Sequence, residues 1–382
     1  MRTIARASIA ATLAAGLLSP AGAVAAQEPA GANGLRKAAL DLELERTPAI
    51  VGESYEKLPP IGQEGQLGAN LKRDTLYLPH QQHGDLFVRA GIVRGDRELI
   101  EQGLSAFDYA FAGQSENGSF GPYQPETYAF FVQSVAHSIG LLQGSPYAAE
   151  YAGILLDYER RLKRASRHMI EPAAWKAFEK RNKSYTHSGY VMGTALGLTS
   201  RLTGSDKLKR RSRDAVRIAL DNQRRSGVNP ELGGYDVRYQ MAGIVYAQRF
   251  TVYFPGGGLS SDVVDMIDSG LRWMKPRIDE DGYIDPGNST RSCVEDNTNG
   301  EPKTPGYNFA IRGFAYWGAL YDRGKLSERA DRMLAYLRSR ANDESLCGPK
   351  SQSAGKAPAQ PAPAPEGPPG QLEDALVEDL FE

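Results

Sequence analysis

The feature that most constrains the fold is a near-continuous series of segments, from about residue 76 to residue 340, whose apolar residues recur at helical spacing. Apolar side chains at i, i+3, i+4 and i+7 share one face of an α-helix, whereas a half-buried strand requires strict alternation. Such alternation is almost absent here. We therefore expect an all-α protein, with helices at 85–93, 97–112, 125–142, 148–164, 172–180, 188–202, 206–225, 237–253, 262–276, 306–321 and 327–340.

Glycine turns recur between these helices. Asn117-Gly118, Leu232-Gly233-Gly234 and Asp281-Gly282 each place a glycine turn and an aromatic residue between one helix and a later one. Repeated helical pairs, none able to bury its apolar face alone, predict a curved or closed array. We expect an (α/α) toroid, complete or incomplete, built of helical hairpins. A helical bundle and an open solenoid are the alternatives.

The two ends of the chain differ from its centre. Residues 1–26 combine two arginines, an apolar run and small residues before a cleavage point, which predicts a secretory signal peptide and an exported protein. Residues 350–382 form a Pro/Ala-rich linker and an acidic tail, a composition that cannot build a core and predicts disorder. We expect the catalytic domain at 27–349.

The charges of the chain bear on its possible partners, and its two cysteines bear on whether it contains a disulfide. The net charge of -1 gives no basis for nucleic acid or a membrane surface. Two basic stretches, 160–168 and 207–217, are either solvated helix faces or an approach for an acidic polymer. In an exported protein Cys293 and Cys347 either pair or stay as free thiols. We expect a monomer that needs no metal or cofactor.

Two segments carry the candidate chemistry. Segment 182–190 (NKSYTHSGY) precedes a helix of small residues, and segment 230–240 (PELGGYDVRYQ) opens a later helix. They resemble the Asn/His and Pro-Glu…Arg…Tyr segments of (α/α)-toroid polysaccharide lyases, the alginate and glucuronan lyases. The separation of His187 and Tyr239 is similar to that of the His and Tyr in those enzymes. The chain departs from the pattern in lacking an Asn-Asn doublet and in placing Arg238 beside the Tyr.

The resemblance implies a lyase that removes the C5 proton of a uronic acid and expels the group on O4. Tyr239 is the expected base and acid, with Tyr235 as the reserve. His187, Asn182 and Glu179 are expected to neutralise the substrate carboxylate, Glu179 as a buried neutral acid. A nearby cation, Arg238 or Arg249, is expected to lower the tyrosine pKa from its ordinary value of about 10.

Other residues and other functions remain open from the sequence. A glycoside hydrolase on the same scaffold would use paired carboxylates, Glu231 with Asp236 or Glu126. Asp236 is also the expected N-cap of the helix at 237–253. A protein that binds glycans without cleaving them is the third alternative. The expected partner is an acidic polysaccharide. The candidates for contacting it are Asn182, Glu179, Glu231, Tyr235, Arg249, Tyr190 and His83.

Overall fold

The computed structural model describes residues 58–72, 76–121, 123–296, 302–340 and 346–347. Within these ranges the chain forms helices and isolated bridges without a strand, which confirms the all-α prediction. Every helix predicted from periodicity is present, and the structure adds the short helices η1 (Gly68–Leu71), α4 (Leu78–Gln81) and η2 (Lys275–Arg277). The expected signal peptide at 1–26 and tail at 350–382 lie outside the described residues.

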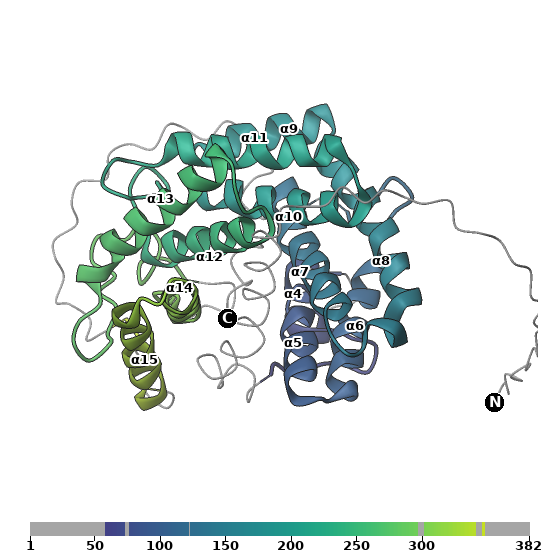
Figure 1. The fold of residues 1–382 in the computed structure, drawn as a ribbon, viewed down its shortest axis with the longest axis horizontal. Coiled ribbons are helices and arrows are strands. Elements are labelled where there is room, and N and C mark those ends of the chain that lie inside the picture. The colour runs from purple at the N-terminus through teal and green to yellow at the C-terminus, as the bar shows by residue number, and fades with distance from the viewer. Residues whose placement is uncertain (1–57, 73–75, 122, 297–301, 341–345, 348–382) are drawn as a thin grey trace, which may run out of the picture.

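The helices form two layers of consecutive pairs. The inner helices are α5 (Gly84–Arg94), α7 (Pro125–Gln143), α10 (Thr186–Thr203), α12 (Val237–Tyr253) and α14 (Tyr307–Leu320). Their outer partners are α6 (Arg97–Ala112), α8 (Ala148–Met169), α11 (Asp206–Asn222), α13 (Gly258–Met274) and α15 (Gly324–Ser339), and α9 (Pro172–Asn182) lies between α8 and α10. Each inner helix packs against its outer partner and against an inner neighbour, and the pairs follow an arc from α5 and α6 to α14 and α15 (Figure 1).

Burial separates the two layers. Every residue of α12 is buried, as are nearly all of α7 and residues 186–200 of α10. An outer helix such as α11 buries only a stripe that includes Leu208, Ala215 and Val216, and its charged residues face away from the core. No helix of the described chain is both long enough and apolar enough to cross a membrane.

Glycines at every fourth position let α10 and α11 approach closely. Gly189, Gly193 and Gly197 lie on one face of α10 because residues four apart are neighbours along a helix. A Cβ atom on Gly193 would lie 2.4 Å from Val216 Cγ2, closer than real atoms pack. The Ser212 hydroxyl also donates a 2.6 Å hydrogen bond to the Gly193 carbonyl. The small-residue helix is thus one half of a tight helix pair.

We predict that Gly193→Ala lowers the free energy of unfolding by about 1–3 kcal/mol, because the added methyl overpacks this contact. Urea unfolding followed by circular dichroism measures the effect. Gly153→Ala is the matched control, since Gly153 is an exposed glycine inside α8 with open space around it. That change should stabilise the protein by about 0.5–1 kcal/mol. Equal effects at both positions would contradict the close packing of α10 on α11.

The same kind of glycine turn occurs four times, each time against an outer helix. Only two of these four turns belong to the set predicted from the sequence. In each instance a glycine with φ between 92° and 94° is pressed against the backbone of an outer helix, where a Cβ would lie within 2.4 Å of a backbone atom. The glycines are Gly65, Gly118, Gly227 and Gly282, against α6, α8, α13 and α15. Gly118 and Gly282 were predicted. The Gly233-Gly234 turn is of another kind, since Gly233 has open space around it.

The N-terminal ends of four inner helices meet at one end of the array. Arg181, in the last turn of α9 and five residues before α10, pairs with Glu126 in the first turn of α7. The backbone at Tyr185 pairs with that at Glu231 ahead of α12, and Gly306 before α14 lies against the Arg238 side chain. Cys293, in the loop that precedes α14, forms a disulfide with Cys347, which follows α15 in the chain. Charged side chains gather at this end of the array.

Candidate functional site

Backbone pairing between two loops brings His187 to Glu231. Thr186 N donates to the Pro230 carbonyl at 3.3 Å, and Leu232 N donates to the Ser184 carbonyl at 2.8 Å. The loop before α10 is therefore fastened to the loop before α12. As a result His187, in the first turn of α10, lies with its Nδ1 atom 3.0 Å from Glu231 Oε2.

His187, Glu231, Tyr239 and Arg291 form one contiguous group, which we call the His–Tyr cluster. The His187 and Tyr239 rings lie 4.7 Å apart between centroids, and the Arg291 guanidinium lies 4.4 Å from the Tyr239 ring centroid. Arg291 Nη1 also donates to Glu231 Oε1 at 3.1 Å. All four side chains are almost completely buried. The cluster therefore combines an imidazole, a phenol, a carboxylate and a guanidinium out of water.

Asp236 holds the Arg291 loop on α12. Its Oδ1 atom accepts hydrogen bonds from the backbone N–H groups of Arg238 and Tyr239, which confirms it as the N-cap of α12. Its Oδ2 atom accepts from the backbone N–H groups of Arg291, at 3.1 Å, and Ser292, at 2.6 Å. One carboxylate thus caps a helix and sets the position of Arg291 over Tyr239.

Burial dominates the acidity of Tyr239. Loss of water raises the pKa of Tyr239 to about 12, although the positive charges of Arg291 and Arg238 act in the opposite direction. The prediction that a cation would lower this pKa below its ordinary value is therefore wrong, because desolvation outweighs the cations. Tyr239 is a neutral phenol near pH 7. It is suited to donate a proton rather than to accept one.

Arg291 was absent from the sequence-based candidates, which were Arg238 and Arg249. The charge of Arg238 does act on Tyr239, in the direction that lowers its pKa, whereas Arg249 lies elsewhere. Arg249 is ten residues after Tyr239 on α12, about 15 Å along the helix axis. Arg291 lies in a loop far along the chain from Tyr239, in a segment without helical periodicity. The only sequence signal would have been its place beside Ser292 and Cys293, which does not distinguish it from other loop arginines.

The structure places Glu179 and Asn182 outside the cluster. Glu179 is exposed on α9 and accepts a hydrogen bond from Trp175 Nε1 at 2.6 Å, so it is not the buried carboxyl expected from the sequence. Asn182 is buried between α9, α10 and α11. Its side-chain oxygen faces Ser188, and its backbone carbonyl accepts from Asn222 Nδ2. Asn182 therefore ties three helices together.

Two predicted tyrosines also lie elsewhere. Tyr235 contacts Trp273 at the end of α13, with ring centroids 4.9 Å apart, and its hydroxyl donates to the Gly287 carbonyl. Tyr190 is fully buried in α10 beside Gly243 of α12. Both are occupied in packing between helices.

Arg249 and His83 line a different cavity, among the inner helices, which we call the arginine pocket. The cavity is small, with a volume of about 60 Å³. The residues that line it are Gln82, His83, Asp85, Leu86 and Arg89 of α5 and the preceding turn, Gln133 and Ser134 of α7, Val245, Tyr246 and Arg249 of α12, and Phe309 and Arg312 of α14. Tyr246 follows Tyr239 by two helical turns, about 10 Å along α12.

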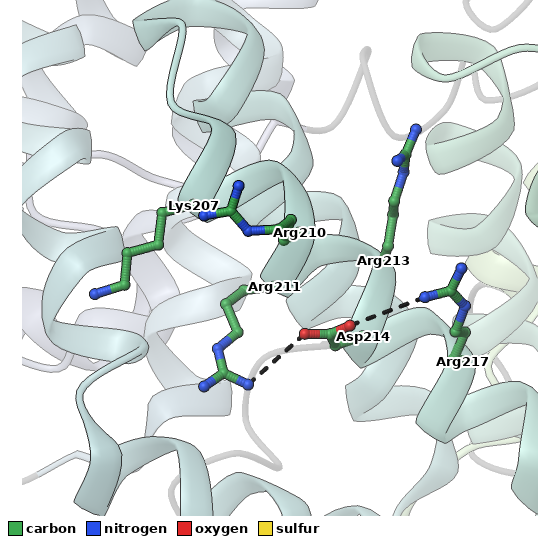
Figure 2. A pocket seen from close by; sticks show the side chains of 6 residues that line it. All are labelled: Lys207, Arg210, Arg211, Arg213, Asp214 and Arg217. Carbon is green, nitrogen blue, oxygen red and sulfur yellow. Dashed lines mark ion pairs between the residues drawn. The ribbon is translucent and has the colours of Figure 1, made fainter.

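The basic stretch at 207–217 lies on α11, in the outer layer (Figure 2). Asp214 pairs there with Arg211, at 3.7 Å, and with Arg217, at 4.0 Å, while Lys207, Arg210 and Arg213 project around it. The Arg211 guanidinium also stacks on Trp175, 4.4 Å from the ring. These contacts are those of a solvated helix face.

Beside the cluster, Lys303 and Glu295 extend the network of charges. Lys303 Nζ donates to Glu295 Oε2 at 2.6 Å, and the same oxygen accepts from Arg291 Nε at 2.9 Å. Burial and the nearby Arg291 lower the pKa of Lys303 to about 8 despite this carboxylate. Within the described residues no group of His, Cys, Asp and Glu side chains is arranged to hold a metal ion.

Comparisons of the chain with protein-family models, with curated proteins and with solved structures find no match.

We predict that Glu231→Gln lowers the free energy of unfolding by about 3 kcal/mol, because it leaves the buried Arg291 charge undercompensated. Chemical denaturation measures the change. Glu150→Gln is the control, since Glu150 pairs with Arg97 at 3.0 Å on the surface. Water screens that ion pair, so removing the Glu150 charge should change the unfolding midpoint little. A similar midpoint for the two variants would show that Glu231 is not a required counter-ion.

The lowered pKa of Lys303 predicts a specific pH dependence of stability. Folded Lys303 loses its proton near pH 8, whereas the unfolded chain keeps it until about pH 10.5. The unfolded state binds more protons in this window, so this lysine makes the protein more stable as pH rises through it. Compared with Lys303→Met, the wild type should gain unfolding free energy from pH 8 to pH 10, with a constant difference below pH 7. A constant difference across the whole range would contradict the prediction.

Proposed function

We propose that this chain is an exported polysaccharide lyase that cleaves a uronic-acid polymer, of alginate or glucuronan type, by β-elimination. We further propose that its paired helices form an incomplete (α/α) toroid, with inner and outer layers arranged along an arc. The observation that carries the proposal is the contact between His187 and Tyr239, held by Glu231 and overlaid by Arg291. The sequence resemblance to toroid lyases rests on the same His and Tyr.

The chemistry divides between the two rings. Glu231 accepts a hydrogen bond from Nδ1–H of His187, which leaves Nε2 as the basic nitrogen. We assign His187 Nε2 as the base that takes the C5 proton, and neutral Tyr239 as the acid that protonates O4 as the C4–O4 bond breaks. A C4=C5 double bond forms. Transfer of the proton from imidazolium to tyrosinate then restores both groups.

Positive charge next to the rings favours this reaction. Removal of the C5 proton shifts negative charge onto the substrate carboxylate, and a fixed cation stabilises that charge most effectively in a site without water. Arg291 and Arg238 supply such charge beside Tyr239. Because the rings are almost completely buried, substrate entry requires a local movement, which we assign to the exposed turn at Leu232 and Gly233.

The contacts favour elimination over hydrolysis. A glycosidase needs two carboxyl groups facing the scissile bond. Glu231 is engaged by His187 and Arg291, both oxygens of Asp236 accept backbone hydrogen bonds, and Glu126 is paired with Arg181. Each of the carboxylates considered for hydrolysis therefore already serves another group.

The test incubates the purified protein with alginate, glucuronan, hyaluronan and pectate while ultraviolet absorbance reports the unsaturated product. We expect turnover on at least one polymer. Tyr239→Phe should lower kcat by at least about 100-fold, since a general acid contributes about 10²–10⁴. Tyr158→Phe is the control, because its hydroxyl is also buried but bonds Leu104 and Asp108 in the outer layer. Thermal unfolding confirms that both variants fold.

Other outcomes separate the alternatives. New reducing ends without ultraviolet absorbance would replace the lyase with a hydrolase. Binding without turnover on every polymer would identify a glycan-binding protein. Equal loss of activity in Tyr239→Phe and Tyr158→Phe would remove Tyr239 from the chemistry.

A further inference from the structure

One surface of α11 gathers positive charge in the outer layer, and we call it the basic face. Its side chains line a hollow of about 430 Å³ and comprise five basic groups and one carboxylate: Lys207, Arg210, Arg211, Arg213, Arg217 and Asp214 (Figure 2). The carboxylate of Asp214 pairs with Arg211 and Arg217. Most of the positive charge on this face therefore has no negative neighbour among the described residues.

The order of charges along α11 does not serve the stability of the helix itself. Basic side chains favour the C-terminal end of a helix, where the helix dipole is negative. The last turn of α11 has no basic residue, whereas Lys207 and Lys209 lie in its first turn. Like charges also stand four residues apart, at Lys207 with Arg211 and at Arg213 with Arg217, which weakens a helix. A negative group bound to the basic face would relieve both effects.

The same chain supplies a negative segment of matching size. Residues 373–382, which we call the acidic segment, contain five carboxylate side chains and no basic residue. The nearest basic residue before them is Lys356. Complementary charges of this kind steer two surfaces together and suppress partners of the wrong sign. The acidic segment therefore carries the charge that the basic face lacks.

The Cys293–Cys347 disulfide ties the chain ahead of the acidic segment to a position near the end of α11. Asp236 accepts hydrogen bonds from the backbone just before Cys293, which holds the disulfide beside the start of α12. Arg224, two residues after α11, donates to the Gly233 carbonyl at 2.7 Å in the same turn before α12. The disulfide and the C-terminal end of α11 are therefore attached to one short stretch of backbone.

The residues between the disulfide and the acidic segment are enough to reach the basic face. Residues 348–372 lie between them, and an extended chain of this length spans up to about 80 Å. The 17 residues of α11 form a helix about 25 Å long. Attachment to the same chain also gives the acidic segment a higher effective concentration than a separate partner would have.

We propose that the basic face of α11 binds the acidic segment of the same chain, residues 373–382, through pairs of its guanidinium and ammonium groups with carboxylates. The contact lies outside the His–Tyr cluster and does not depend on the lyase proposal. Exposed ion pairs are weak individually and are screened by salt. Binding therefore requires several pairs together and low ionic strength.

Cross-linking of the full chain with a water-soluble carbodiimide tests the proposal, because this reagent joins a lysine amine to a carboxylate that touches it. We expect an amide between Lys207 or Lys209 and the acidic segment, identified by mass spectrometry of peptide fragments. The yield should fall at least about fivefold in about 1 M salt, where charges are screened beyond about 3 Å.

A double variant removes charge from the basic face without removing a lysine. Arg210→Gln with Arg213→Gln should lower the cross-link yield about fivefold, since two exposed pairs are lost. Neither arginine has a hydrogen-bond or ion-pair partner among the described residues, so this variant should fold. Arg160→Gln with Arg167→Gln is the matched control. It removes two exposed arginines from α8 and should leave the yield unchanged.

A mixture of isotope-labelled and unlabelled protein shows which chain supplies the carboxylates. Amides within one chain support the proposal, whereas amides only between labelled and unlabelled chains would assign the basic face to a second copy and overturn it. Cross-linking of the acidic segment to Lys163 of α8 as readily as to Lys207 would also overturn it. So would an unchanged yield in the Arg210→Gln and Arg213→Gln variant, or the absence of any amide to the acidic segment.

Discussion

The inner helices of this protein are buried around most of their circumference, and this constraint governs the placement of their charges. A charge without water is costly unless it is paired and hydrogen-bonded. Asp85 on α5 accordingly meets Arg89, Arg249 and His137. At the end of the array, His187 and Arg291 meet Glu231 in the same way. Both clusters thus arise where polar groups on buried helices converge.

Asp236 shows how one carboxylate can organise such a site. It satisfies N–H groups at the start of α12, which any buried helix end requires, and it binds the loop at Arg291 and Ser292 with its other oxygen. The guanidinium over Tyr239 is therefore anchored to the helix that carries Tyr239. The Cys293–Cys347 disulfide constrains the same loop two residues later. The Asp236 side chain therefore both caps α12 and fixes a loop that is distant in the sequence.

The helices and the helix cap were predictable because their signals are local. Apolar spacing identified the helices, and Asp236 preceded an apolar segment as N-caps do. The proximity of His187 and Tyr239 was inferred from a resemblance, and the two rings do lie in contact. Glu179 was wrongly placed in the cluster, because its closeness to His187 in the sequence does not determine which way its side chain points. On α9 it faces solvent and Trp175.

The sequence alone determined that the chain is helical and approximately where its helices begin and end, because periodicity and capping act over a few residues. Only the tertiary structure decided that Arg291 covers Tyr239, that burial raises the tyrosine pKa, and that Arg249 joins Arg89 and Arg312 in another pocket. These relations depend on distances between segments tens of residues apart and on the exclusion of water. Both follow from how the helices pack.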